Sequence, residues 1–158
     1  MHWNVALLTP PYSTLTYAVP DYFSDQKWRP CLRICVPLGK SRRPGILISQ
    51  CEKQDPNYSI KPFFWPLEQE PLINPEYMEL IFDLGRRQLK TPGEILASIL
   101  PAGLRSLNLI LNVEHPEFSA PVKFKELFRM ENDRFQQLLE LWKNNRVRIT
   151  QNSSGKEK

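Results

Sequence analysis

The chain has 158 residues, of which 41% are hydrophobic and 24% charged, and its formal net charge is +4. This balance is typical of a globular protein of one ordinary domain or two small ones, and it excludes a chain too polar to fold. No apolar run approaches the roughly 18 residues that a membrane-spanning helix requires, so the sequence also excludes a transmembrane protein.

The first part of the chain has the pattern of a small β structure. Short apolar runs alternate with turn residues such as proline and glycine. The runs predict strands at residues 5–8, 14–19, 31–38, 45–49 and 61–67. The last of these contains Pro62 and Pro66, which restrict it to the edge of a sheet. Several short strands at this spacing indicate a small barrel or sandwich.

Two of these strands flank a turn that is both glycine-containing and basic. Gly39 allows a partner to come close to the backbone, and Lys40, Arg42 and Arg43 supply positive charge beside it. Such a tip suits a phosphate chain better than a small organic substrate. The alternative is a hairpin end whose charges only increase solubility.

The pattern then changes to helices. Asn74 is a suitable N-cap for a helix that begins at Pro75, and Thr91 to Glu94 form a capping box for a second helix. Apolar residues at helical spacing predict the buried stripes. These are Tyr77, Leu80, Ile81 and Leu84 in the first helix, and Ile95, Leu96, Ile99 and Leu100 in the second.

The last part of the chain has a different organisation. Alternating apolar residues predict a strand over 107–113, Ser119 and Asn132 can each cap a helix, and residues 146–150 alternate between arginine and apolar residues. Two short helices followed by a basic strand are typical of a winged-helix unit. Asp133 and Glu140 on the second helix repel phosphate, which favours DNA contacts by Arg146 and Arg148 on the wing, or a packing role of the unit, over base reading by this helix.

These patterns together predict an α+β protein with a boundary near Gly103. We expect a small β-barrel-like domain with two packing helices over residues 1–104 and a reduced winged-helix unit over residues 105–150. The polar residues 151–158 are expected to form a disordered tail.

The sequence offers little for catalysis or metal binding. It contains no phosphate-binding loop of the Gly-x4-Gly-Lys-Ser/Thr type and no nucleophile or zinc-protease motif. Cys31, Cys35 and Cys51 have no partner histidine in sequence, because His2 and His115 are isolated. We therefore expect no enzyme activity, no metal and no cofactor. An odd number of cysteines without a secretory leader indicates free thiols and a cytoplasmic location.

Charge and aromatic residues point to nucleic acid. From Asp25 to Arg43 there are six cations and one acid, whereas from Glu68 to Asp83 there are five acids and no cation. Most aromatic residues of the first part are expected in the core, but one or two near cations can stack on an unpaired base. Lys61, which precedes the aromatic run, can reach a phosphate.

The order of several short strings resembles the start of the PriA family of replication-restart helicases. The resemblance covers about the first 105 residues. Its strings are Val5–Leu7 (VAL), Ser13–Pro20 (STLTYAVP), Leu32–Lys40 (LRICVPLGK), Gly45–Ile48 (GILI), Ile60–Lys61 (IK), Glu70–Leu72 (EPL) and Gly93–Pro101 (GEILASILP). The resemblance implies a compact β domain that captures the 3′ end of a nascent strand, followed by a winged-helix domain.

The resemblance also implies a pocket for the DNA 3′ end. Its positions correspond here to Leu15, Thr16, Tyr17, Gly39 and Lys61. Tyr17, Gly39 and Lys61 match the family pattern, whereas Leu15 and Thr16 replace the phenylalanine and aspartate of its Phe-Asp-Tyr string. A carboxylate can accept hydrogen bonds from a terminal 3′ hydroxyl, and threonine does so more weakly. The helicase motor and zinc-binding cysteines of the family are absent, so we expect a fragment or a protein reduced to its DNA-binding front end.

We therefore predict a DNA-binding module that recognises forked or 3′-ended DNA at stalled replication forks, with replication-restart proteins as further partners. Lys40, Arg42, Arg43, Arg146 and Arg148 would contact phosphates. Two alternatives stay open. The chain could be a protein-interaction module of the replication or recombination machinery, which the substitutions at the pocket and the acidic run favour. It could also be a winged-helix transcription regulator with an extra β domain, although its second helix is weakly basic.

Overall fold

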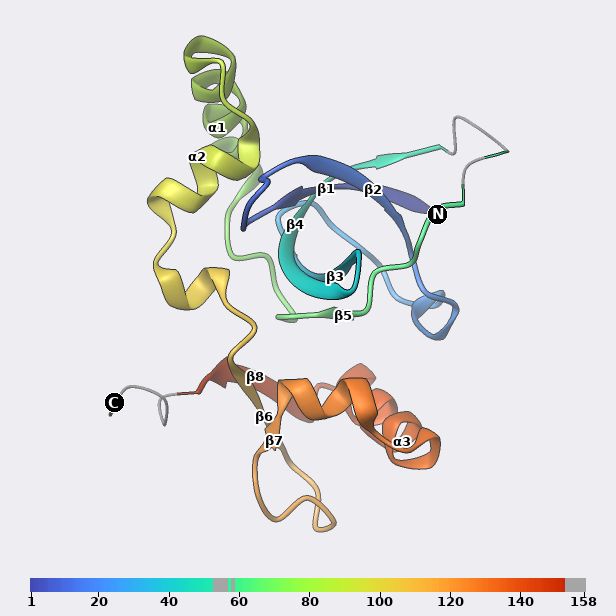
Figure 1. Ribbon diagram of the computed structural model, residues 1–158. Helices are drawn as coiled ribbons and strands as arrows, with labels where there is room; N and C mark the ends of the chain where they lie inside the picture. The colour runs from blue at the N-terminus through green and yellow to red at the C-terminus, as the bar shows by residue number, and fades with distance from the viewer. Residues whose placement is uncertain (53–56, 58, 153–158) are drawn as a thin grey trace. The chain divides into compact units, whose positions relative to one another are not determined.

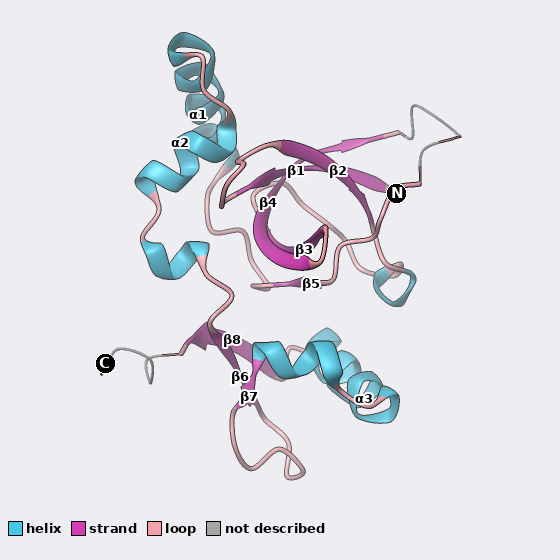
Figure 2. Cartoon of the chain, viewed as in Figure 1, coloured by secondary structure: helices cyan, strands magenta, loops and turns pink. Residues whose placement is uncertain are grey.

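The computed structural model describes residues 1–52, 57 and 59–152, and it divides into two compact units, Met1–Arg105 and Ser106–Lys158. Each unit contains its own antiparallel sheet together with helices (Figures 1 and 2), so the predicted α+β class is confirmed. Among the described residues, no helix is long and apolar enough to cross a membrane.

The first unit, unit 1, is built on a strongly curved sheet of five strands (Figure 1). The strand order is β2-β1-β4-β3-β5, and every neighbouring pair is antiparallel. The strands are β1 (His2–Leu7), β2 (Thr14–Ala18), β3 (Arg33–Leu38), β4 (Ser41–Cys51) and β5 (Trp65–Pro66). A short 3-10 helix, η1 (Asp21–Phe23), follows β2.

The sheet is not a closed barrel, which corrects the barrel-like expectation. The predicted strand over 61–67 contributes only the two residues of β5 to the sheet. The residues just before β5 meet the opposite edge through an isolated bridge between Ala18 and Pro62. The Ala18 amide donates to the Lys61 carbonyl and the Phe63 amide donates to the Ala18 carbonyl, both at 3.0 Å. The two edges are therefore joined at one point rather than along a ladder.

The sheet of unit 1 buries hydrophobic residues on both of its faces, because strand residues alternate between them, although Thr14, Thr16 and Ser49 stay exposed. One face holds the core cluster of Trp3, Val5, Leu7, Tyr17, Leu32, Ile34, Val36, Leu47 and Phe63. The other face packs Ala6, Leu8 and Ile46 against residues of the two helices. Most of the aromatic residues expected in the core are indeed buried, among them Phe23 and Trp65.

The helices begin where the sequence predicted. In α1 (Pro75–Gln88) the Tyr77 amide donates to the Asn74 side chain, and in α2 (Pro92–Ile99) the Glu94 amide donates to the Thr91 hydroxyl. Both N-caps are thus confirmed. A 3-10 helix, η2 (Ala102–Arg105), ends the unit.

The predicted buried stripe of α1 is confirmed at Ile81 and, in part, at Leu84, but it is wrong at Tyr77 and Leu80. Tyr77 and Leu80 are 45% and 51% exposed, whereas Met78, Ile81 and Gly85 are buried. The reason is the close approach of the α1–α2 turn: a Cβ on Gly85 would lie 2.7 Å from the Lys90 carbonyl oxygen. The glycine must therefore face inward, and this sets the rotation of the helix.

The buried stripe of α2 is shorter than predicted. Ile95 and Leu96 are buried, but Ile99 is 45% exposed. The start of α2 lies directly on the β1–β2 connection, where a Cβ on Gly93 would lie 2.3 Å from the Leu7 carbonyl oxygen. This contact fixes the first turn of the helix and leaves its last turn at the surface.

Unit 2 (Ser106–Lys158) contains a three-stranded sheet in the order β7-β6-β8. Its elements are β6 (Leu109–Val113), β7 (Val122–Lys123), the 3-10 helix η3 (Phe124–Arg129), α3 (Asn132–Lys143) and β8 (Val147–Gln151). Buried side chains from all of them, such as Leu111, Phe124, Leu138 and Trp142, form the core.

Three local predictions for unit 2 need correction. Ser119 caps no helix, because β7 comes between it and η3, whose N-cap is Lys123. Asn132 is the first residue of α3 and Glu131 is its N-cap. Gln151 belongs to β8, so it is not part of a tail, and residues 153–158 of the predicted tail lie outside the described residues.

Candidate nucleic-acid interface

A cavity of about 580 Å³ opens in unit 1 where β2, the β3–β4 turn and the segment before β5 come together. All five residues of the predicted 3′-end pocket line it: Leu15, Thr16, Tyr17, Gly39 and Lys61. They come from three segments that are far apart in sequence. The curvature of the sheet and the bridge at Ala18 bring these segments to one place.

Tyr17 forms a fixed wall of the cavity. Its side chain is only 4% exposed, and its hydroxyl donates a 2.7 Å hydrogen bond to the Pro37 carbonyl oxygen. Burial raises the pKa of this phenol, so it stays protonated and keeps its role as a donor. The bond ties β2 to the end of β3. Leu15, which is partly buried against the same core, adds an apolar surface beside it.

Thr16 belongs to a short polar chain that crosses β1. Its hydroxyl donates to Asn4 Oδ1 at 3.1 Å, and Asn4 Nδ2 donates to the Ser49 hydroxyl at 3.2 Å. The hydroxyl proton of Thr16 is therefore already engaged in a hydrogen bond within the protein. Its oxygen still has lone pairs and can accept a hydrogen bond from a group in the cavity.

The β3–β4 turn has the tight geometry that the sequence predicted. Leu38 pairs with Ser41, so the loop consists of Gly39 and Lys40. Gly39 has a φ of +59°, which glycine adopts without strain, and a Cβ added there would meet nothing within 4 Å. The backbone of this turn is therefore open to a molecule in the cavity. The Arg43 Nε donates to the Ser41 hydroxyl at 3.2 Å.

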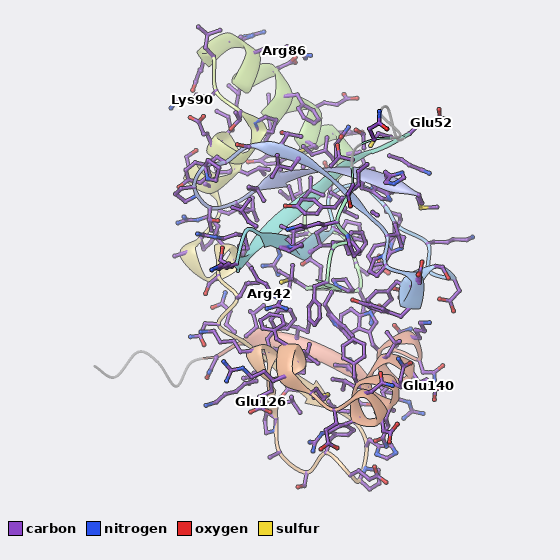
Figure 3. All side chains as sticks on the ribbon, turned by 45° about the vertical axis from the view of Figure 1, so that its right-hand side comes forward. Arg42, Glu52, Arg86, Lys90, Glu126 and Glu140 are labelled. Carbon is purple, nitrogen blue, oxygen red and sulfur yellow. The ribbon has the colours of Figure 1, made fainter. Side chains whose placement is uncertain are left out.

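Arg42 points away from this cavity and toward aromatic residues. Its guanidinium carbon lies 5.3 Å from the centre of the Phe64 ring, and the Tyr22 hydroxyl donates to the Phe64 carbonyl oxygen at 2.6 Å. Burial raises the pKa of Tyr22 to about 12, with Cys35 adding to the rise and Arg42 opposing it. Figure 3 shows Arg42 well apart from Glu52, which lines the cavity. Arg42 therefore lies apart from the cavity.

The charged side chains in the lining are Lys61 and Glu52. Lys61 is exposed, and its carbonyl group accepts the hydrogen bond from Ala18 that joins the sheet edges. This backbone hydrogen bond holds the segment from which the Lys61 ammonium group extends. Glu52 follows the last residue of β4 and is also exposed.

The predicted phosphate contacts in unit 2 lie outside the predicted 3′-end pocket, and Arg146 lines a separate cavity of about 620 Å³ together with Glu114 and His115. Arg146 and Arg148 are exposed, and neither lines the cavity of unit 1. The Arg146 guanidinium lies 3.9 Å from the Glu114 carboxylate in an exposed pair, and Arg148 lies opposite Asn112 in the β6–β8 ladder.

Sequence reasoning missed more than half of the lining. Thr14, Pro37 and Leu38 are chain neighbours of predicted residues and could have been included. The same holds for Ser59 and Ile60, which directly precede Lys61. Asn4, Cys51 and Glu52 carry no local signal, because the pairing of β1 with β2 and β4 brings them to the cavity. Among the described residues, no group of three or more histidine, cysteine or acidic side chains could hold a metal ion.

Comparison with known proteins identifies the family of the chain. Residues 4–101 match the model of the PriA 3′DNA-binding domain, abbreviated 3′BD. The chain is also 31% identical over 104 residues to the replication restart protein PriA of Haemophilus influenzae, an alignment that covers 65% of this chain and 14% of the relative. The chain thus spans about one seventh of the length of that relative. The resemblance found in the sequence is confirmed, and the chain belongs to the PriA 3′DNA-binding-domain family.

Proposed function

We propose that this chain binds branched or 3′-ended DNA, of the kind present at stalled replication forks, as a DNA-binding module in replication restart. The observation that supports this most is the convergence of Leu15, Thr16, Tyr17, Gly39 and Lys61 on a single cavity. Membership in a family whose model is a 3′DNA-binding domain is consistent with it.

The lining suggests how a terminal nucleotide is held. The buried Tyr17 and the apolar Leu15 offer a rigid surface for the sugar and base, and the exposed backbone at Gly39 allows close approach. Lys61 neutralises the last phosphate, and Lys40 and Arg43 on the adjoining turn contact flanking phosphates. Arg42, beside Phe64, would contact DNA outside the cavity.

The proposal extends to the organisation of the chain. Unit 1 acts as the 3′-DNA-binding domain, and unit 2 acts as a reduced winged-helix domain whose Arg146 and Arg148 contact duplex phosphates. The chain itself unwinds nothing, and any motor activity belongs to other segments or partners. Its action on chromosomal DNA, together with three free cysteines, favours the cytoplasm.

Binding to forked DNA with a free or a blocked 3′ hydroxyl tests the proposal. We expect the full chain to bind the free end more tightly, by several-fold, in fluorescence anisotropy at low ionic strength. Equal affinity for both ends would exclude recognition of the terminus, and no binding at all would exclude the function.

Salt dependence tests the cations of the turn. Because each phosphate contact contributes about 0.7–0.9 to the slope of log K against log salt, reversing the charge of Arg42 and Arg43 together should flatten the slope by about 1.5. An unchanged slope would exclude both residues as phosphate contacts.

A protein-interaction module is the second candidate, and one observation favours it. Tyr77, Leu80 and Ile99 expose apolar surface on the two helices, as a docking face would. The acidic run gives less support than the sequence suggested, because three of its five acids pair with arginines of unit 1: Glu68 with Arg33, Glu70 with Arg29 and Asp83 with Arg86. Electrophoretic shifts on forked, duplex and single-stranded DNA separate the two candidates.

A further inference from the structure

The cavity contains an acid that an ordinary DNA-binding surface would avoid. Glu52 lines the same 580 Å³ space as Lys61, at the end of β4, and its side chain is exposed. It is attached directly to Cys51, the last residue of β4. In the described part of the chain no hydrogen bond or ion pair involves its carboxylate.

The chemistry of a carboxylate limits what it can recognise. An ionised carboxylate only accepts hydrogen bonds, and it repels the phosphate groups that make up most of the surface of DNA. It gains binding energy from a donor, and the sugar at the end of a strand offers one in its free hydroxyl. A bond of this kind is charge-assisted and is stronger than one between neutral groups.

The other polar side chains of the lining cannot make this distinction. Thr14, Thr16 and Ser59 carry hydroxyl groups, which can donate to a phosphate oxygen or accept from a hydroxyl. Thr16 already donates its proton to Asn4, but it remains a neutral acceptor that does not repel an anion strongly. Lys61 attracts any phosphate. Glu52 alone among the described lining residues is negatively charged and so penalises a phosphate.

We propose that Glu52 is a specificity-determining residue: it accepts a hydrogen bond from a terminal 3′ hydroxyl and excludes a strand that ends in a 3′ phosphate. Lys61 and Glu52 then contact different groups of the terminal nucleotide: the cation binds its 5′-side phosphate, and the carboxylate binds its free hydroxyl. This inference rests on the proposed DNA-binding function and adds the chemical group by which the end is read.

The experiment compares two forked oligonucleotides that differ only in a 3′ hydroxyl or a 3′ phosphate. The variant Glu52→Gln keeps the size of the side chain and removes its charge, and Glu79→Gln on the exposed face of α1 removes the same charge outside the cavity. We expect the natural chain and Glu79→Gln to prefer the hydroxyl end by roughly tenfold. Glu52→Gln should lose most of this preference, with weaker binding of the hydroxyl end and tighter binding of the phosphate end.

The outcomes separate this inference from the function on which it rests. If the natural chain binds neither fork, the proposed function fails. If it prefers the hydroxyl end and Glu52→Gln keeps that preference, only the role of Glu52 is overturned. The role of Glu52 is also overturned if Glu52→Gln loses the preference for the hydroxyl end when the terminal base is cytosine but keeps it when the base is thymine. The carboxylate would then contact the exocyclic amine of the base. Matching melting temperatures of the variants verify that folding is unchanged.

Discussion

The two units use strand residues in different ways. In unit 1 a hydrophobic cluster lies on each face of the sheet, and the polar residues of interest lie on the edge strand β2 and on the turns and connections beside it. In unit 2 the β6–β8 ladder buries Leu111 and Val147 on one face and exposes Asn112 and Arg148 on the other. A sheet with a hydrophobic cluster on each face leaves mainly its edge strand and turns for binding groups, and here these converge on a cavity. A sheet with one open face carries its cations along an exposed strand.

This contrast predicts different kinds of recognition. A cavity with a fixed tyrosine, an open glycine and two opposite charges can distinguish one end of a strand from another. An exposed arginine such as Arg148 attracts any phosphate and distinguishes little. Four experiments can test this difference between the two units.

The largest effect should come from the scaffold that shapes the rim of unit 1. Gly93→Ala forces a Cβ to within 2.3 Å of the Leu7 carbonyl oxygen and 2.8 Å of that of Tyr12, and backbone atoms cannot move aside easily. We expect a loss of about 3 kcal/mol in the free energy of unfolding. Hydrogen exchange should increase mainly in unit 1. A control change at the exposed Gln88 to alanine should have little effect, and equal loss of protection in both units would contradict the contrast.

The next largest effect concerns the cation of the cavity. Lys61→Glu should weaken binding of 3′-ended forks by about tenfold, or 1.4 kcal/mol, because it replaces attraction of the terminal phosphate with repulsion. Lys90→Glu makes the same charge change at the α1–α2 turn, away from the cavity (Figure 3). Anisotropy titrations should show at most about a twofold effect for this control. Similar losses for the two variants would mean that net charge alone governs binding.

Thiol chemistry offers a smaller and more local test. Cys31 and Cys35 are buried, and burial raises the pKa of Cys35 to about 12, with Arg42 opposing the rise. Cys51 is only partly buried and lines the cavity. N-ethylmaleimide at neutral pH should therefore modify Cys51 first, which mass spectrometry detects, and weaken 3′-end binding by a few-fold. Cys51→Ser should make binding insensitive to the reagent. First modification at Cys31 or Cys35 would contradict the packing described.

The smallest effect is expected in unit 2. Arg146→Ala and Arg148→Ala should each reduce affinity by about twofold, equally for free and blocked 3′ ends, because an exposed phosphate contact carries no information about the terminus. The quantity to measure is the ratio of the dissociation constant for a blocked 3′ end to that for a free 3′ end. A change in that ratio would show that unit 2 takes part in reading the end, and the contrast between the units would then be wrong.

The sequence predicted best what depends on a few neighbouring residues. The caps at Asn74 and Thr91 and the turn at Gly39 follow rules that act within one turn of chain, and all three are present. The stripe of α1 was correct at Ile81 but misplaced at Tyr77 and Leu80, because the rotation of a helix depends on what it packs against. Here that is the α1–α2 turn beside Gly85, which no local pattern describes.

The cavity shows the same limit. The resemblance to a family supplied Leu15, Thr16, Tyr17, Gly39 and Lys61, and these do lie together. Glu52 could not be found in this way, because it reaches the cavity through the pairing of β1 with both β2 and β4. The β1–β4 pairs join residues more than thirty positions apart in sequence, beyond the reach of periodicity or spacing.

The single bridge between Ala18 and Pro62 has a consequence for how the protein behaves in solution. An uncovered strand edge invites pairing with another molecule and can lead to aggregation. Here the segment that carries Lys61 covers part of the β2 edge, and Pro62 and Pro66 deprive it of two amide donors. The peptide that delivers a cation to the cavity therefore also protects the sheet against edge-to-edge self-association.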